Sequence, residues 1–591
     1  MFHPISYKTK ESSADLVSWG HWFMLFNGFI AILCGTRYVI ALGSPDTFLG
    51  WTYLLVNGIS HFIFLAFCVY LLTLFPLSLF LPFSKILRGA GALIATVAIA
   101  TLWFDIKVFR SYGIHLSPLS FDLAWTKLSD VLRWPEFTLS TLLLFVTELI
   151  VANWIWKRIK RIEKKRLGKK ITAFIALGFI TTHVMHIWAD INEEHLILAQ
   201  DKMFPLSYPA TARTLIHRHG LQEKIKQNQQ HVAQQLHYPQ EPLQCNATGN
   251  FKNILVVGVE GWSADFIDEK TMPFFVRYAQ DQVQFSAHYS GGTYRNAGLF
   301  SLLYSLQGSY IDAIDFDYTP PVFQSVLQQH EYNMVAFRQK EQSIYPKKML
   351  DGFTLYATLQ NENMAYGDAK TVQQFLDWKS KQDQHWFSLV TLSGPAFYDV
   401  PEGFIGIPSV RNHQKYNTAE RVLFNQYRQS LFALDLQLQK LISNLDPDTI
   451  VVLTGVYGQV FSSSSKGTRE RFARSALHVP MVLHDQALGR KTVHYKTHHT
   501  SMMPTILTEY FACTTPTQGY SSSQTLLQPN SHTWLYMGDK EDFAIHLEDS
   551  ITVIDPHGQY AMYDMNFKPL TKPRLPAKEI IEVIKEGQRF F

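Results

Sequence analysis

The chain has 591 residues, of which 47% are hydrophobic and 17% are charged, and its formal net charge at pH 7 is +4. This length allows more than one domain, and the small net charge excludes a protein that binds nucleic acid through general basicity. Four cysteines are too few for a disulfide-rich scaffold.

Five apolar stretches occupy the first third of the chain. A transmembrane helix needs roughly 20 apolar residues, and the stretches lie near residues 21–42, 50–82, 88–108, 137–156 and 171–190. The first stretch is too long for a signal peptide and ends without a small-residue cleavage site. Core helices of a soluble protein would not be apolar on all sides over successive windows. We therefore predict a five-span α-helical membrane domain over residues 1–190.

Nine Lys and Arg residues lie between residues 157 and 170, in the turn before the fifth stretch. Short loops rich in Lys and Arg stay in the cytoplasm. The first connection, residues 43–49, has no Lys or Arg, whereas the third carries four and runs against the pattern. On balance, the N-terminus is predicted to be cytoplasmic and the residues after the fifth span extracytoplasmic. The basic turn is also expected to attract anionic lipids, and it can dock a cytoplasmic partner.

Polar side chains inside the predicted spans are costly there and usually face the helix bundle or a wet cavity. They are Arg37, His61, Asp105, Glu148, His183 and His186. Arg37, Asp105 and His186 are near span ends, from which their side chains can extend to the lipid headgroups. Glu148 is the one acid well inside a span. A lipid transporter that uses Glu148 and Asp105 is therefore one alternative function.

Residues 191–250 are predicted to form a connector between the membrane domain and the outer domain. Its segment PLSYPATAR, Pro205 to Arg213, has two prolines, which disfavour helix and favour an extended strand at the membrane surface. Thr211 and Arg213 offer a hydroxyl and a guanidinium suited to a phosphate. The alternative is that Arg213 pairs with the outer domain or with ordinary phospholipid headgroups. The Gln-rich run at 222–244 is expected to be a solvated linker.

Residues 251–591 are long enough for one large outer domain. Short β-branched, apolar runs recur at 253–259, 333–337, 386–392, 449–454 and 479–483. Helical stretches alternate with them, and the best spans Thr418 to Asn444, with Asn417 as its N-cap and Glu420 three residues later. This alternation predicts a mainly parallel sheet with helices on both faces and a site at the carboxyl ends of its strands.

Two of the strand connections carry groups suited to chemistry. Glu260 ends the first strand, where its carboxylate could bind a divalent cation. Thr293 follows two glycines and precedes a helix, where a hydroxyl and backbone NH groups could meet a phosphate. Either feature alone is common in proteins without such a site. Cys245 and Cys513 are the only cysteines outside the predicted spans, and the sequence leaves their pairing open.

Together these features resemble the alkaline-phosphatase-like superfamily, which includes sulfatases, lipoteichoic-acid synthases and phosphoethanolamine transferases. The resemblance implies a sulfatase-like α/β fold with an acidic residue on the first strand, a Thr, Ser or modified Cys nucleophile, and a late Asp-His metal pair. Val456 and Tyr457 stand in place of that pair; valine has no ligand atom, and a neutral tyrosine hydroxyl is a poor ligand. The segment LSGPAFY, 392–398, also lacks the His that the transferases tend to carry. We therefore expect a degenerate site with only the vestigial Glu260 and Thr293, no cofactor, and no metal unless at Glu260.

Motifs along the whole chain resemble the PbgA (YejM) family of Gram-negative inner-membrane proteins. They are WGHWFMLFN (19–27), HFIFLAF (61–67), YLLTLFPL (70–77), IWADIN (187–192) and PLSYPATAR (205–213). The resemblance implies five spans in the bacterial inner membrane, a cytoplasmic N-terminus and a periplasmic sulfatase-like domain.

The resemblance also implies a function. The expected protein is a non-enzymatic sensor of lipopolysaccharide that controls lipid A synthesis and outer-membrane homeostasis. It would act through a membrane adaptor and a protease that degrade the deacetylase committing precursors to lipid A. Anionic phospholipids, including cardiolipin, are further expected partners. The implied lipid contacts are Tyr208, Pro209, Thr211, Ala212 and Arg213, and Thr214 replaces a second Arg common in the family.

The competing prediction is an enzyme. A metal-dependent phosphatase or phosphoethanolamine-type transferase would use Glu260 and Thr293. Its unrecognised metal ligands would be among His478, His484, His498 and His499. A cardiolipin-binding or transport protein is the other alternative.

Overall fold

The computed structural model forms two compact units, residues 1–235 and residues 236–591. We call them the membrane unit and the α/β unit. The structure describes residues 12–42, 45, 47–81, 83–126, 134–165, 167–192, 194–198, 200, 203–207, 236–246, 251–339, 346–358, 363–411, 416–460, 470–539, 542–555, 558–571 and 574–591.

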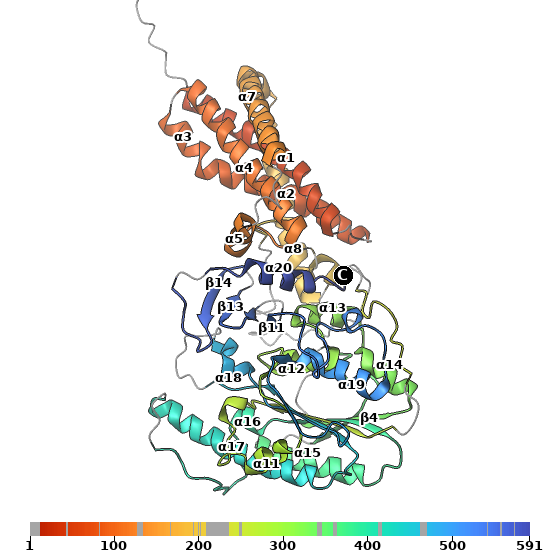
Figure 1. The fold of residues 1–591 in the computed structure, drawn as a ribbon. Helices are drawn as coiled ribbons and strands as arrows, with labels where there is room; N and C mark the ends of the chain where they lie inside the picture. Colours follow the sequence, from red (N-terminus) through yellow and green to blue (C-terminus); the bar gives the residue numbers. More distant parts are fainter. Residues whose placement is uncertain are drawn as a thin grey trace, which may run out of the picture. The chain divides into compact units, whose positions relative to one another are not determined.

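The membrane unit is a bundle of long apolar helices (Figure 1). They are α1 Ser13–Leu42, α2 Phe48–Leu72 with its continuation α3 Leu74–Phe80, α4 Ser84–Tyr112, α7 Trp134–Lys164 and α8 Gly168–Asn192, with the short helices α5 Pro118–Thr126 and α9 His195–Leu198. Among the described residues, five spans are long and apolar enough to cross a membrane, which confirms the prediction. Ile40, Leu72 and Phe80 are 75%, 78% and 81% exposed. Such surfaces are stable in hydrocarbon, where helices satisfy their own backbone groups.

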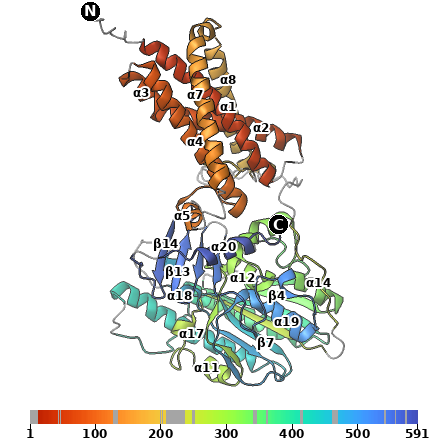
Figure 2. The same ribbon diagram turned by 45° about the horizontal axis from the view of Figure 1, so that its top comes forward.

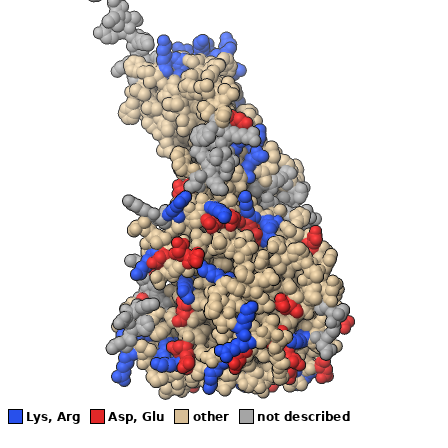
Figure 3. All heavy atoms as spheres, viewed as in Figure 1, with Lys and Arg blue, Asp and Glu red and all other residues tan. Residues whose placement is uncertain are grey.

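Lys and Arg side chains gather at the end of the bundle where α7 ends and α8 begins (Figure 3). The last turn of α7 carries Arg161 and Lys164. The band of the bundle next to this end shows few charged side chains on the visible face. The bundle therefore has one basic end beside an apolar belt, as expected of a helix bundle in a bilayer.

Several polar side chains face the bundle interior. Asp105 accepts hydrogen bonds from Tyr38 Oη at 2.5 Å and from the backbone NH of Leu116 at 2.5 Å. Glu148 is fully buried and accepts one from Asn27 Nδ2 at 3.2 Å. His186 is 1% exposed. Extension to the lipid headgroups is therefore wrong for Asp105 and His186, because helix packing encloses both side chains.

The α/β unit is built on an eight-stranded sheet of order β5-β4-β6-β1-β7-β8-β2-β9. The strands are β1 Ile254–Glu260, β2 Val283–Phe285, β4 Asn333–Gln339, β5 Thr354–Thr358, β6 Trp386–Leu392, β7 Ile450–Tyr457, β8 Met481–His484 and β9 Lys491–Val493. Five neighbouring strands, from β5 to β7, run parallel, and β8 pairs antiparallel with β7. The mainly parallel sheet is thus confirmed, and β1 lies at its centre.

Helices cover both faces of this sheet (Figure 2). One face carries α11 Pro273–Gln280, α15 Met364–Lys379 and α17 Thr418–Ile442; the other carries α12 Arg295–Tyr304, α14 Val322–Gln329 and α19 Met502–Phe511. Alternate residues of β1 serve the two cores: Ile254 and Val256 pack on one side, Leu255 and Val257 on the other. The predicted capping box at the start of α17 is present.

A second, antiparallel sheet was not predicted from the sequence. Its strands are β11 Leu535–Gly538, β12 Phe543–His546, β13 Ser550–Ile554 and β14 Tyr560–Asp564. Further α-helices and strands of this unit are α13 Ile311–Phe316, α16 Gly394–Phe397, α18 Arg474–Leu477, α20 Ala577–Glu586, β3 His288–Tyr289 and β10 Thr497–His498.

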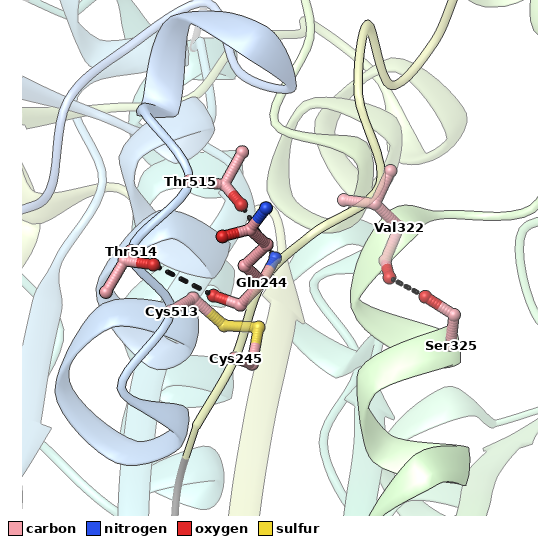
Figure 4. The surroundings of a disulfide bond; sticks show 7 residues. All are labelled: Gln244, Cys245, Val322, Ser325, Cys513, Thr514 and Thr515. Carbon is pink, nitrogen blue, oxygen red and sulfur yellow. Dashed lines mark hydrogen bonds between the residues drawn. A yellow bond between two sulfur atoms is a disulfide. The ribbon is translucent and has the colours of Figure 1, made fainter.

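Residues 236–246, at the end of the predicted connector, pack into the α/β unit. Tyr238 is 6% exposed and donates a hydrogen bond to the carbonyl of Tyr304 at 2.7 Å. A solvated linker is therefore wrong for 236–244. Cys245 forms a disulfide with Cys513 (Figure 4), which resolves the pairing that the sequence left open.

Removing this disulfide is expected to destabilise the α/β unit. The bridge joins residues 268 positions apart, and losing a bridge over such a long loop typically costs about 2–4 kcal/mol. Urea unfolding of the full chain in mild detergent, for a variant with both Cys245→Ser and Cys513→Ser, measures the change. Cys34→Ser, at a free cysteine of the bundle, is the control. An unchanged unfolding midpoint of the α/β unit in the double variant would contradict the expectation.

Candidate functional site

Glu260, the last residue of β1, lies at the carboxyl edge of the sheet and is 1% exposed. Arg295, the first residue of α12, pairs with it through two hydrogen bonds, Nε to Oε1 at 2.5 Å and Nη2 to Oε2 at 2.7 Å. Ser393 Oγ donates to Oε1 at 3.1 Å, and Tyr457 Oη to Oε2 at 3.5 Å. Both carboxylate oxygens are therefore bonded to side chains of the protein, and a guanidinium supplies the counter-charge.

Asp368, on α15, is the second buried carboxylate near this edge. It accepts hydrogen bonds from the backbone NH groups of Ser393 at 2.9 Å and Gly394 at 2.6 Å, and from Gln339 Nε2 at 2.9 Å. Burial raises the pKa of Asp368 to about 7, against the opposing effect of these donors. Its oxygens hold the turn that begins α16.

Val456 and Tyr457 end β7 beside Glu260, as the resemblance implied. Val456 is fully buried. Burial, followed by the charge of Glu260, raises the pKa of Tyr457, so that its hydroxyl stays neutral. Thr293 is half-buried and lies in the loop that leads into α12, two residues before Arg295. The structure thus brings Glu260, Val456 and Tyr457 to one edge of the sheet.

The four histidines that could have completed a metal site have other partners. His478 Nδ1 lies 2.6 Å from Asp265 Oδ1, and His484 Nδ1 lies 2.6 Å from Gln282 Oε1. His498 Nδ1 lies 2.8 Å from Thr500 Oγ1, and His499 Nε2 lies 3.0 Å from the carbonyl of Gly455. Among the described residues, no group of three or more His, Cys, Asp and Glu could hold a metal ion. The donors at Glu260 therefore do not fit a divalent cation.

Sequence reasoning missed Arg295. The sequence holds a signal for it. A basic residue stands at the start of the helix that follows Thr293, and the carboxylate at the end of the first strand has no late Asp-His pair that could hold a cation beside it. Such a carboxylate needs a counter-charge. The sequence alone did not say which basic residue supplies it.

The predicted lipid contacts, 208–213, lie outside the described residues, but the segment directly before them is described. Phe204 is 4% exposed, and its ring lies 5.0 Å from that of Phe62 and 5.9 Å from that of His61. His61 Nε2 lies 2.8 Å from the carbonyl oxygen of Pro205. Leu206 is 67% exposed. Within the membrane unit, the connector is therefore anchored to α2 immediately before the predicted motif.

The fold and the site define a class: a membrane protein with a sulfatase-like domain in which the carboxylate that ends the central strand, Glu260, is paired with an arginine. Two family models match. The domain of unknown function DUF3413 matches residues 6–245, and Sulfatase matches residues 252–508. The predicted sulfatase-like fold is thereby confirmed.

Two proteins are similar to this chain along nearly its full length. The inner membrane protein YejM of Salmonella typhi is 28% identical over 98% of this chain and 98% of YejM. An uncharacterized protein of Haemophilus influenzae is 27% identical over 98% of this chain and 97% of its own. A crystal structure of a putative sulfatase from Bacteroides thetaiotaomicron has 12% identity and a TM-score of 0.47, covering 57% of this chain and 93% of that one. The chain is a homologue of YejM along nearly its full length and a multi-pass inner-membrane protein, which confirms the family predicted from its motifs.

Proposed function

We propose that this protein is a non-enzymatic regulator that binds lipopolysaccharide, through lipid A, at the periplasmic leaflet of the inner membrane. It controls lipid A synthesis and outer-membrane homeostasis through a membrane adaptor and a protease that degrade the lipid A deacetylase. The N-terminus is cytoplasmic and the α/β unit periplasmic. The disulfide between Cys245 and Cys513 supports this orientation, because disulfides persist in oxidising compartments such as the periplasm.

The observation that carries the proposal is the anchoring of Met203–Pro205 in the bundle, against α2. Met203 and Phe204 are buried in the bundle, and His61 lies within hydrogen-bond distance of Pro205. Tyr208 follows Ser207 directly. A lipid held by 208–213 therefore acts on a segment fixed to a membrane span. If the lipid prefers one arrangement of that segment, its binding shifts the bundle toward that arrangement.

The chemistry of the motif suits a phosphate. Arg213 supplies a guanidinium, Thr211 a hydroxyl, and the backbone its NH groups. Thr214 supplies no charge at the position where the family resemblance implies a second Arg, so this chain is expected to make one phosphate contact fewer. Anionic phospholipids, including cardiolipin, are further partners attracted by the basic end of the bundle.

The pairing of Glu260 with Arg295 supports a regulator that has no catalytic activity and needs no cofactor. Arg295 occupies both oxygens of Glu260, and Tyr457 contributes only a neutral hydroxyl. A metal-activated Thr293 would need anionic or imidazole ligands that this edge does not offer.

Arg213→Ala is expected to reduce co-purifying lipid A about tenfold, because a charge-assisted hydrogen bond to phosphate is lost. Lipids extracted from the full chain, purified in mild detergent, are quantified by mass spectrometry. Arg277→Ala, at an exposed residue of α11, is the matched control. Equal amounts of lipid A in Arg213→Ala and wild type would reject the motif, and loss of function in Thr293→Ala alone would favour the enzyme.

A further inference from the structure

The segment that follows α20, residues 587–591, packs against the end of the connector, and we call it the α20 tail. Phe590 is fully buried, and its ring lies 5.4 Å from that of Tyr238 and 5.6 Å from that of Tyr310. The carbonyl oxygen of Phe590 accepts a hydrogen bond from the backbone NH of His237 at 2.8 Å. One buried ring thus joins the end of the connector to the turn before α13.

The α20 tail is itself fixed to the body of the α/β unit. The guanidinium of Arg589 donates to the carbonyl of Ser521 at 2.6 Å and to the carboxylate of Glu586 at 2.5 Å. The carbonyl of Arg589 accepts from Gln240 Nε2 at 3.3 Å. Tyr310 Oη donates to the carbonyl of Glu586. The tail is therefore bonded on one side to the α/β unit and on the other to the connector.

The end of the connector has two attachments of different kinds. Cys245 is joined to Cys513 by the disulfide, a covalent bond that opens only by reduction or exchange with a thiol. Residues 236–240 are held by hydrogen bonds and ring contacts, among them Tyr238 Oη to the carbonyl of Tyr304 at 2.7 Å and the two bonds to the α20 tail. Such contacts open and close locally at equilibrium. Residues 236–240 can thus leave the α/β unit while the disulfide stays closed.

We propose that the α20 tail is a clamp that fixes the end of the connector on the α/β unit, with Phe590 as its positioning residue. The connector is then anchored at both ends, by Met203–Pro205 in the membrane unit and by 236–246 in the α/β unit. The lipid-contact motif, 208–213, lies between the two anchors in the sequence. The inference rests here on the proposed function, since an arrangement of the connector that bound lipid favours acts on the α/β unit through this clamp.

Hydrogen–deuterium exchange of the full chain in mild detergent tests the clamp with Phe590→Ala. The amides of residues 236–240 are expected to exchange more than about tenfold faster in this variant, because truncating a buried aromatic ring strongly destabilises its contacts. The amides of β1, and those of 244–246 beside the disulfide, should keep their wild-type rates. Phe590→Leu keeps an apolar side chain in the same place and should restore most of the protection.

Phe591→Ala is the matched control. Its ring also lies beside that of Tyr310, at 5.4 Å, but the side chain is 38% exposed, and it should leave the exchange of residues 236–240 unchanged. Wild-type rates for these amides in Phe590→Ala would overturn the clamp. Equal acceleration of residues 236–240 and β1 would also overturn it, because Phe590 would then stabilise the whole fold and not the attachment of the connector.

Lipopolysaccharide added to the same samples tests whether the clamp couples the connector to the α/β unit. In wild type it is expected to slow exchange at residues 517–521, where Arg589 is bonded, by at least about twofold. Phe590→Ala should lose this response and still bind lipid A, because the motif lies outside the clamp. The same response in Phe590→Ala as in wild type would overturn the coupling.

Lipid extraction separates this inference from the proposed function. If Phe590→Ala frees residues 236–240 while Arg213→Ala retains lipid A, the clamp stands and the lipid-contact motif fails. If Arg213→Ala loses lipid A while Phe590→Ala leaves the exchange of residues 236–240 unchanged, the motif stands and the clamp fails.

Discussion

Arg295→Ala is expected to lower the free energy of unfolding of the α/β unit by about 3–5 kcal/mol, the usual cost of leaving a buried charge without its partner. Glu260 is 1% exposed, and its two oxygens take their shortest contacts, 2.5 and 2.7 Å, from this guanidinium. The remaining contacts, from Ser393 and Tyr457, come from neutral hydroxyls. Urea unfolding of the full chain in detergent measures the change.

A second substitution shows whether the stability is lost because the ion pair is broken or because the arginine side chain no longer packs there. Adding Glu260→Gln to Arg295→Ala removes the buried charge and should restore most of the lost stability, because a neutral amide is cheaper to bury than a carboxylate. Arg277→Ala, at an exposed arginine of the same unit, should change the free energy of unfolding by less than about 0.5 kcal/mol. If the double variant were as unstable as the single one, the guanidinium would act by packing and not by charge.

The elements that the sequence predicts best are those with a local sequence pattern. All five spans follow from windows of apolar residues, and the central strands follow from short β-branched runs between polar turns. The capping box of α17 is likewise a local signal, with Asn417 and Glu420 three residues apart. The second sheet, β11 to β14, escaped notice because its short strands carry weaker apolar runs.

The parts predicted poorly depend on contacts between distant residues. The partner of Glu260 is 35 positions away, and the partner of Cys245 is 268 positions away. Asp105 stands near the end of its span, which suggested extension to the headgroups, yet Tyr38 and the turn at Leu116 enclose it. Spacing in a sequence does not encode such contacts; only the packing of the helices and strands does.

Acid is expected to destabilise the α/β unit, because three histidines in and beside β3 and β10 are buried in their neutral form. Burial lowers the pKa of His498 to about 4 and that of His499 to about 3, and it lowers the pKa of His288 well below its usual value. The unfolded chain protonates these groups near pH 6.5. Below that pH the unfolded state binds more protons than the folded state, so stability falls as the pH falls.

The size of this effect follows from the pKa differences. At pH 5, relative to pH 7.5, His498 and His499 each cost about 2 kcal/mol, and His288 adds a cost of the same sign. Asp368 acts in the opposite direction, because its pKa of about 7 in the folded state lies above the unfolded value, and its protonation returns about 2.5 kcal/mol over the same range. The free energy of unfolding of the full chain in detergent, measured in urea between pH 7.5 and 5, tests this slope. Because Asp368 offsets part of the loss, the same measurement on Asp368→Asn should show a steeper fall in stability, and a pH-independent value in that variant would show that the histidines are not held neutral.

His498→Asn isolates one of the three groups without removing its structural role. The side chain of His498 caps the turn after β10 by accepting from the backbone NH of Thr500, and asparagine is among the best N-cap residues. The variant should keep the fold at pH 7.5 and lose about 1.4 kcal/mol per pH unit of the acid slope between pH 6.5 and 4. His385→Gln, at an exposed histidine, should leave the slope unchanged. An unaltered slope in His498→Asn would mean that this imidazole takes up its proton in the folded state as well, and that its burial does not keep it neutral.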